Sequence, residues 1–440
     1  MHFRLKGKWN LMTKKIQIRS AKCSYEKEPL KTAFGFKGSA LTCLWQTAAY
    51  LESDEHIAVG IGVQSVLWSD ASVYGKFGED EGNRKMYALT EYAIGLCKGF
   101  EFFIPFELLD FLFPKIYSYA KKIIDCDELR TTFVLNALVP IDFAAWQLWA
   151  KENKKTSFDE ICKFDGKHQE LLANIPLITY NTSLEEILDM ANAGTAIFKI
   201  KIGSDPNKNN NLDEMLSWDK NRILEIHNIL SKIKTSHTVS GNILYYLDAN
   251  GRYDTKERLM NLLEFAGEHG ILERIILLEE PFDENNKINI SDLPVCVAAD
   301  ESAHSVDDVK ERFNLGYKAL TLKPIAKTLS MTIRMADYAR KQGMVCFCAD
   351  LTVNPIMVSW NQNVASRLDV LPGMCIGVIE SNGEQNYENW DIMRTYHPTY
   401  EQQFTQCKAG LFHLDETFYE LNGGVFSIPK HFCDLIKGEK

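Results

Sequence analysis

Short β-rich runs alternate with helical segments along most of the second half of the chain, and this rhythm constrains the fold more than any other feature. Eight β-rich runs occur, at residues 177–180, 196–202, 243–248, 274–279, 295–300, 319–323, 345–350 and 376–380. Six amphipathic segments lie between them, at 183–193, 219–234, 254–269, 306–313, 328–342 and 354–368. Strands joined by helical crossovers pair in parallel, which predicts an α/β fold.

Eight such strands fit a closed barrel better than an open sheet. Polar residues stand at the ends of many of the runs, as they do at the carboxyl face of a barrel. An open doubly wound sheet calls for a glycine-rich first turn, and the sequence has none. We therefore predict a (β/α)8 TIM-type barrel that forms a catalytic domain at residues 141–390.

The first 140 residues follow a different pattern. Residues 15–24, 41–50 and 57–68 are typical of three strands in a meander, and residues 84–129 turn helical and aromatic. A sheet followed by helices predicts an α+β domain at 1–140, separate from the barrel. The tail at 391–440 follows the last strand without another strand–helix unit, and we expect it to return to the N-terminal domain.

Composition narrows the partners. The 440 residues carry a net charge of −10, which argues against nucleic acid or an anionic membrane as the main partner. The apolar stretch at 99–117 is too rich in charges and prolines to span a bilayer, and the N-terminus lacks a signal-peptide core. Eleven cysteines without framework spacing predict reduced thiols and a cytoplasmic location.

Charged residues at the predicted strand ends carry the chemistry. Each motif alone is common as a turn or a solvated edge, but five successive strands supply one in turn: FKIKIG (Lys199, Lys201), YYLDANG (Asp248, Asn250), LLEEP (Glu279, Glu280), AADES (Asp300, Glu301) and LTLKP (Lys323). Three carboxylates that converge from consecutive strands require a cation, and hard oxygen ligands suit Mg²⁺. Lysines beside that cation are expected to have lowered pKa values, as an amine base at neutral pH requires.

The order Lys, Asp, Glu, Asp, Lys over residues 175–323 resembles the enolase superfamily, and within it the muconate lactonizing enzyme subgroup. The resemblance implies one Mg²⁺ per chain on Asp248, Glu279 and Asp300, with Lys201 and Lys323 as the acid/base pair. It implies that Lys199 steadies Lys201 or the substrate, and that the N-terminal α+β region is a capping domain. The mandelate racemase-like subgroup places a His on strand seven and is disfavoured, because Asp350 and Lys323 stand here.

The same resemblance implies further contacts. Phe34 and Phe36, in the FGFKGS segment, are expected to meet the substrate, as are Asn250 and Glu301; Asp350 and Glu380 are expected to support catalysis. Two departures stand out. Dipeptide epimerases of the subgroup carry a DxD pair on strand eight, where this chain reads ESNGEQNYENW, and IAKTLS follows LKP where a glycine pair is often found.

The expected reaction is removal of a proton alpha to a substrate carboxylate through an enediolate, giving epimerisation of a dipeptide or N-acyl amino acid. Cycloisomerase and o-succinylbenzoate synthase-like dehydratase activities are alternatives on the same fold. A Schiff-base lysine aldolase and a non-catalytic binding protein are the alternatives from other classes. The expected partner is a small carboxylate, and the resemblance also allows a homo-oligomer.

Overall fold

The computed structural model describes residues 13–36, 39–164 and 166–438, without the side chains of residues 34–36 and 39. A three-stranded antiparallel sheet comes first, in the order β2 (Ser20–Phe36), β3 (Ser39–Glu52) and β4 (Ile57–Gln64). Helices α1 (Val66–Ser69), α2 (Ala71–Cys97), α3 (Pro105–Ile124) and α4 (Thr131–Glu152) follow. Short strands β1 (Ile16–Gln17) and β5 (Glu101–Phe102) pair with each other. The α+β character expected of this region is present, but its helices begin earlier than expected.

Helix α4 is buried on almost every side, which its apolar sequence explains. It is long and apolar enough to span a membrane by length and composition, yet its apolar window is entirely buried within the fold. The glycines of strand β4 let helix α4 pack closely against the sheet. A Cβ on Gly60 would lie only 2.1 Å from the Pro140 carbonyl oxygen. The predicted boundary between residues 140 and 141 therefore falls inside a helix that packs along the N-terminal sheet.

Eight parallel strands form the barrel. They are β8 (Ile197–Lys201), β9 (Leu244–Asp248), β10 (Ile275–Glu279), β11 (Val297–Ala299), β12 (Ala319–Leu322), β13 (Val345–Cys348), β14 (Gly377–Glu380) and a first strand in two pieces, β6 (Leu171–Ile175) and β7 (Leu177–Ile178). β7 pairs with β8 and β6 pairs with β14, so the sheet closes at Pro176, which lacks the N–H for a continuous ladder. Seven of the predicted strands lie within two residues of the observed ones. The first prediction was wrong, because that strand begins at Leu171 rather than 177.

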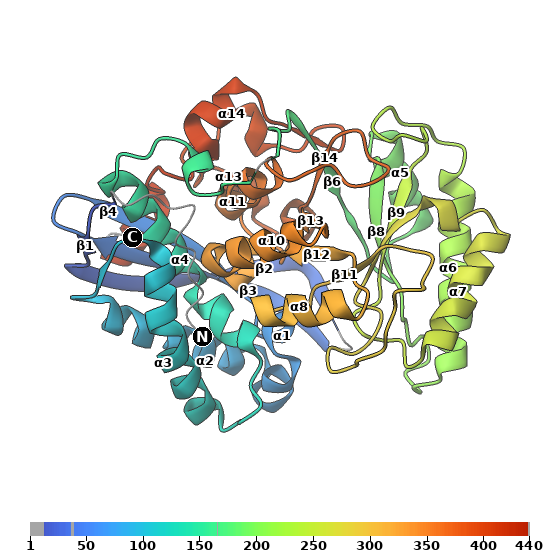
Figure 1. Cartoon of the computed structure of the whole chain (residues 1–440), viewed down its shortest axis with the longest axis horizontal. Helices are drawn as coiled ribbons and strands as arrows, with labels where there is room; N and C mark the ends of the chain where they lie inside the picture. The colour runs from blue at the N-terminus through green and yellow to red at the C-terminus, as the bar shows by residue number, and fades with distance from the viewer. Residues whose placement is uncertain (1–12, 37–38, 165, 439–440) are drawn as a thin grey trace.

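Helices cover the outside of the barrel. They are α5 (Leu184–Asn192), α6 (Leu212–Leu230), α7 (Lys256–Glu268), α8 (Val306–Asn314), α9 (Pro324–Lys327), α10 (Leu329–Lys341) and α11 (Pro355–Ala365). Helices α5, α6 and α7 lie on the side away from the N-terminal helices (Figure 1), whereas α9 and α10 pack against α4. Helix α6 begins seven residues before the predicted start, where Asn211 caps it by accepting bonds from Asp213 and Glu214 amides. Residues 280–296, all of which the structure describes, join β10 to β11 without a helix.

The period of two along the strands separates two packed layers. Ile197, Tyr246, Leu277 and Phe347 belong to one cluster inside the barrel, where the Tyr246 and Phe347 rings meet edge to face at 5.4 Å. Their strand neighbours, such as Phe198 and Leu278, pack outward beneath the helices. Side chains thus fill the interior below the carboxyl ends of the strands, and only those ends are left to form a cavity.

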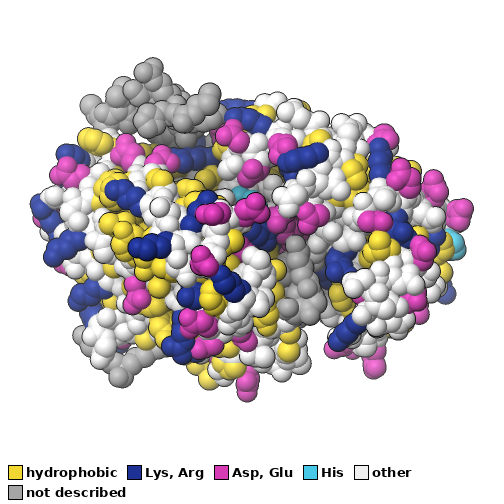
Figure 2. All heavy atoms as spheres, turned by 90° about the horizontal axis from the view of Figure 1, so that it is seen from below, with side chains coloured by type: hydrophobic (Ala, Val, Ile, Leu, Met, Phe, Trp, Pro, Cys, Tyr) yellow, Lys and Arg dark blue, Asp and Glu magenta, His cyan; other side chains and the backbone are white. Residues whose placement is uncertain are grey.

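The C-terminal segment ties the two regions together. After α12 (Gly383–Asn386) and α13 (Trp390–Arg394), strand β15 (Leu411–His413) pairs antiparallel with β6. Helix α14 (Glu416–Leu421) follows, and α15 (Lys430–Lys437) packs against β2 and β3. On the face seen in Figure 2, positive and negative side chains are interspersed.

Candidate active site

A cavity of about 570 Å³, measured out to its open mouth, lies at the carboxyl ends of the barrel strands. Charged groups from the ends of seven strands form its floor: Lys199, Lys201, Asp248, Glu279, Asp300, Glu301, Lys323, Asp350 and Glu380. The inward positions set by the two-residue period explain this, because Lys199 and Lys201 continue the row of Ile197, and Asp248 continues that of Tyr246.

Three carboxylates gather on one side of the floor. Glu279, Asp300 and Glu301 are all buried, and one oxygen from each lies within 4.8 Å of the others. Glu301 accepts a bond from Asn250 at 2.9 Å through one oxygen, while its second oxygen is buried without a hydrogen-bond partner among the described residues. Such a group fits a divalent cation, because carboxylates at this spacing repel one another and a buried oxygen otherwise remains unpaired.

Asp248, the third ligand implied by the resemblance, lies beside this group rather than in it. Its Oδ2 forms ion pairs with the ammonium groups of Lys199, at 3.0 Å, and Lys201, at 2.7 Å. The candidate ligand set is therefore Glu279 and Asp300, together with Asp248 or Glu301.

The two expected catalytic lysines stand on opposite sides of the cavity. Lys201 ends β8, and Lys323 follows β12, four strands further around the ring of eight. Lys201 binds Asp248 and Asn250, and Lys323 lies 2.6 Å from Asp300 Oδ2 and 4.5 Å from the centre of the Trp68 ring. A planar substrate between them would present one face to each amine.

Lys199 occupies the centre of the floor. Its ammonium lies 3.0 Å from Asp248, 3.1 Å from Glu279 and 3.2 Å from Glu380, and 4.8 Å from the centre of the Tyr246 ring. It is almost completely buried. Its single positive charge is shared among carboxylates from three strands, and the supporting role expected of it stays a prediction.

The pKa shifts follow from this packing. Burial by itself lowers the pKa of Lys323, but the carboxylates of Asp300, Glu279 and Glu301 together outweigh it and leave the pKa raised. The pKa of Lys199 is also raised despite burial, because the carboxylates of Asp248, Glu279 and Glu380 surround its ammonium group. Burial raises the pKa of Glu279 to about 7 against the opposing charge of Lys199. The lowered lysine pKa values expected beside a bound cation stay a prediction.

Lys327 was missed by the sequence reasoning. It is fully buried at the end of α9, and its ammonium donates to Asp300 Oδ1 at 3.0 Å, to the Asp300 carbonyl at 2.7 Å and to the Ala303 carbonyl at 2.8 Å. The only signal was the departure IAKTLS after LKP, in which Lys327 is the charged residue.

Strained backbone turns shape the strand ends. Asn250, Glu280 and Thr352 adopt φ values of +44°, +39° and +56°, in the left-handed region that costs a non-glycine residue free energy. In Glu280 this turn sends the side chain toward the next strand, where it accepts bonds from the Asp300 and Ser302 amides at 2.7 and 3.2 Å. Glu280 therefore holds the loop that carries Asp300.

The opposite side of the floor is built by β13 and β14. Asp350 accepts bonds from the backbone amides of Leu351 (2.7 Å), Val353 (3.3 Å) and Asn382 (2.7 Å). Burial, with the charge of Glu380, raises the pKa of Asp350 to about 7.

The upper wall of the cavity comes mainly from the N-terminal region. Leu30, Leu41 and Leu44 of the β2–β3 hairpin and Trp68 of α1 line it. None of these was anticipated, and Trp68, expected at a strand end, is helical. The side chains of Phe34 and Phe36 lie outside the described part of the structure.

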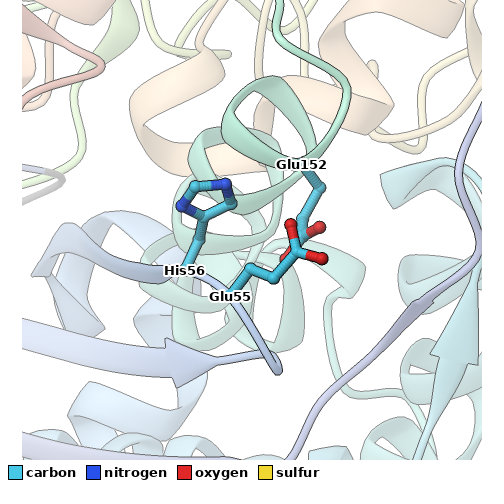
Figure 3. A group of neighbouring side chains, drawn as sticks. All are labelled: Glu55, His56 and Glu152. Carbon is cyan, nitrogen blue, oxygen red and sulfur yellow. The ribbon is translucent and has the colours of Figure 1, made fainter.

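A second group of possible ligands lies away from the cavity. The carboxylates of Glu55 and Glu152 lie close together near His56 (Figure 3). Lys14 already pairs with both, at 2.9 Å to Glu55 and 2.6 Å to Glu152. We interpret this group as an ion-pair cluster.

Comparison of the sequence with family models and with curated proteins gives no match. Solved structures do match. A mandelate racemase/muconate lactonizing protein from Herpetosiphon aurantiacus is 15% identical, with a TM-score of 0.64 over 91% of this chain and 96% of that one. A dipeptide epimerase from Enterococcus faecalis, complexed with Mg and L-Leu-L-Tyr, is 16% identical, with a TM-score of 0.61 over 84% and 92%. An N-succinyl Arg/Lys racemase from Bacillus cereus is 17% identical, with a TM-score of 0.60 over 84% and 89%.

These similarities establish the class of fold. The chain has the barrel and N-terminal α+β architecture of enolase superfamily structures, so the fold implied by the strand-end motifs is confirmed. At this level of identity the comparison speaks to the fold, and the reaction has to be argued from the site.

Proposed function

We propose that this protein removes the proton alpha to a carboxylate and returns it on the opposite face, as an epimerase of dipeptides or other N-substituted amino acids. The observation that carries the proposal is the placement of Lys201 and Lys323 on opposite strands of the barrel, with a buried group of carboxylates between them. Two amines that face each other across a carbanion are the arrangement that epimerisation needs.

A divalent cation fits the same site, and we propose one Mg²⁺ per chain. Glu279 and Asp300 would hold it, with Asp248 or Glu301 as the third ligand. When bound, the cation would stabilise the negative charge that develops on the substrate carboxylate as the proton leaves. It would also draw carboxylate charge away from the lysines and favour their neutral form, as a base requires.

The chain's own residues supply the remaining steps. Lys201 takes or gives the proton at one face, and Lys323 does so at the other. Asn250 orients Lys201 through a hydrogen bond, and Glu280 fixes the loop that carries Asp300. The apolar wall of Leu30, Leu41 and Leu44 excludes water from the reacting carbon.

The alternatives explain less of the site. An aldolase that uses one lysine as a Schiff base leaves the three buried carboxylates without a role. A non-catalytic binding protein has no need for two lysines on opposite strands. Cycloisomerisation and dehydration use the same groups and differ only in the substrate's leaving group.

A deuterium-exchange screen tests the proposal. Dipeptides, N-acyl amino acids and acid sugars are incubated with the protein and Mg²⁺ in D2O, and the alpha-proton signal is followed by NMR. We expect exchange that EDTA abolishes and that the double variant Lys201→Ala/Lys323→Ala lacks. Exchange that survives EDTA together with borohydride trapping of substrate would support the aldolase, and no exchange across the library would contradict the proposal.

We further propose that the protein works in the cytoplasm on a small carboxylate substrate. All eleven cysteines lie among the described residues and none forms a disulfide, which agrees with a reducing compartment.

A further inference from the structure

Arg130, at the start of α4, joins three segments that surround the candidate active site. Its Nη1 donates to the Trp68 carbonyl at 3.4 Å, and its Nη2 donates to the Glu301 carbonyl at 3.1 Å and to the Glu284 carboxylate at 2.6 Å. Trp68 belongs to the N-terminal region, Glu284 to the connection between β10 and β11, and Glu301 to the turn after β11. Arg130 is not among the described residues that line the cavity, so it connects the two regions from outside the site.

The segment that carries Trp68 is bound to the start of α4 at a further point. The backbone amide of Arg130 donates to Asp70 Oδ2 at 3.0 Å, two residues after Trp68. The Trp68 ring lies with its centre 4.5 Å from the ammonium of Lys323. Arg130 is therefore connected to the lysine on one side of the cavity through a single aromatic side chain.

Glu301 extends the same contact toward the other lysine. Arg130 binds the Glu301 carbonyl, and the Glu301 side chain accepts a bond from Asn250 at 2.9 Å. Asn250 in turn accepts a hydrogen bond from Lys201. Glu301 and Asn250 are buried, which strengthens such bonds because the surroundings are poorly polarisable. One guanidinium is thus connected to both lysines, along separate paths.

An arginine at this position is costly if stability is its only purpose. The Arg130 side chain is 13% exposed, and its Nε is buried without a hydrogen-bond partner among the described residues. Buried polar groups without partners cost free energy. A planar guanidinium does, however, hold several acceptors in fixed directions at once, which the flexible chain and compact ammonium of a lysine do less well. The geometry therefore favours a role in positioning.

We propose that Arg130 is a positioning residue that keeps Lys201 and Lys323 in the opposed arrangement that proton transfer requires. It does so by fixing Trp68 on one side of the cavity and the Glu301 turn on the other. The inference rests on the proposed function and adds to it a residue that does not line the cavity. A displacement of about 1 Å between reacting groups can cost about a hundredfold in rate, so this link should affect kcat more than KM.

The first test needs no substrate. The protein is treated with formaldehyde and sodium cyanoborohydride, and the methylation of each lysine is followed by peptide mass spectrometry. In Arg130→Lys, which keeps the charge but loses the planar fork, Lys323 should be methylated about tenfold faster than in the wild type, because Trp68 covers it less firmly. Lys199 is as buried as Lys323 and is the internal reference, with an unchanged rate expected. Equal acceleration at Lys199, or none at Lys323, would overturn the inference.

Kinetics then measure the effect on the proposed reaction. With a carboxylate that the wild type exchanges in D2O, Arg130→Lys should lower kcat about a hundredfold and change KM by less than about threefold. Wild-type kcat in this variant would overturn the inference and leave the proposed function standing. A wild type that exchanges no carboxylate would contradict the proposed function, and the methylation rates would still decide whether Arg130 positions Lys323.

Arg334→Lys is the matched control. Arg334 also joins the two regions, since from α10 it donates to both carboxylate oxygens of Asp110 in α3, at 2.7 and 2.8 Å, and it is 19% exposed. Like Arg130, it is not among the described residues that line the cavity. We expect wild-type methylation of Lys323 and wild-type kcat. Changes as large as those in Arg130→Lys would mean that any loosening between the regions has this effect, and would contradict the assignment.

Glu284→Gln is the second variant if Arg130→Lys does not fold. It leaves Arg130 in place and removes the negative charge that orients the guanidinium. The methylation rate of Lys323 should rise and kcat should fall, each by a smaller factor than in Arg130→Lys. Wild-type values of both quantities would overturn the inference.

Discussion

Lys327 donates to Asp300 Oδ1 at 3.0 Å, while Lys323 lies 2.6 Å from the other oxygen of the same carboxylate. The two amines have different surroundings. Lys323 lines the cavity and faces Trp68, whereas Lys327 is fully buried and also holds the carbonyls of Asp300 and Ala303. One lysine is thus placed to meet a substrate, and the other fixes the candidate ligand and its loop.

Lys327→Met should destabilise the protein. The variant removes three bonds and leaves part of a buried carboxylate uncompensated, which costs about 3–5 kcal/mol when one partner of a buried pair is lost. Urea denaturation without added metal measures the free energy of unfolding. Lys341→Met, on the exposed face of α10, is the control and should change it by less than about 0.5 kcal/mol. Equal stability of the two variants would contradict the role of Lys327.

Loss of either proposed catalytic lysine, Lys201 or Lys323, should affect only one face of the substrate. Lys201→Ala and Lys323→Ala should each lower epimerisation about 10²- to 10⁴-fold, the contribution of a positioned acid or base. Because each lysine serves one face, each variant should still exchange the alpha proton of one stereoisomer. NMR in D2O combined with chiral chromatography distinguishes the two. Equal loss of exchange from both stereoisomers in one variant would argue against a base on each face.

Magnesium should stabilise the folded protein through the acid group. Metal at about a hundredfold its dissociation constant adds about 2.7 kcal/mol to the free energy of unfolding, which scanning calorimetry detects as a rise in Tm. Glu279→Gln should remove that rise. Glu55→Gln, in the ion-paired cluster with Lys14, should keep it. A rise that survives Glu279→Gln would place the metal elsewhere.

The third ligand can be identified by the same measurement. Glu301 lies within the acid group, and Asp248 lies beside it on two lysines. If Glu301 is the ligand in solution, Glu301→Gln weakens the Mg²⁺-dependent rise in Tm more than Asp248→Asn does. The opposite order means that Asp248 leaves its lysines when the metal binds, as the family resemblance implies.

Asp219 should make stability depend on pH. It accepts bonds from Gly203 (2.8 and 2.9 Å) and Tyr253 (2.8 Å), yet burial raises its pKa to about 7. An unfolded aspartate titrates near about 4, so between about pH 4 and 7 the folded state keeps a proton that the unfolded state has lost. Stability therefore falls as pH rises through this interval, by on the order of a few kcal/mol.

The Asp219→Asn variant isolates this contribution. Its free energy of unfolding should fall less between pH 4.5 and 7.5 than that of the wild type, as measured by urea denaturation at both pH values. Asp391→Asn, at an exposed carboxylate, should follow the wild type. Equal slopes for Asp219→Asn and the wild type would contradict the raised pKa.

Local patterns determined the barrel and the floor of its site. Strand periodicity is a property of neighbouring residues, so the two-residue spacing of Lys199 and Lys201 fixes their common face in any strand. Parallel strands bring their carboxyl ends together, and Asp248, Glu279, Asp300 and Lys323 could therefore be placed at one face from the sequence. The start of the first barrel strand was not predicted, because Pro176 interrupts that strand and divides it into β6 and β7.

Only the tertiary structure decided what surrounds that floor. Lys327 reaches Asp300 from a separate short helix, and Trp68 and Leu30 arrive from a region more than a hundred residues earlier in the chain. The same holds for the grouping of Glu301 rather than Asp248 with Glu279, and for the position of Asp350 across the ring. Contacts between distant segments depend on how whole elements pack, and no local period encodes them. The sequence by itself therefore identified the strands and their polar ends, and packing decided which of those ends meet.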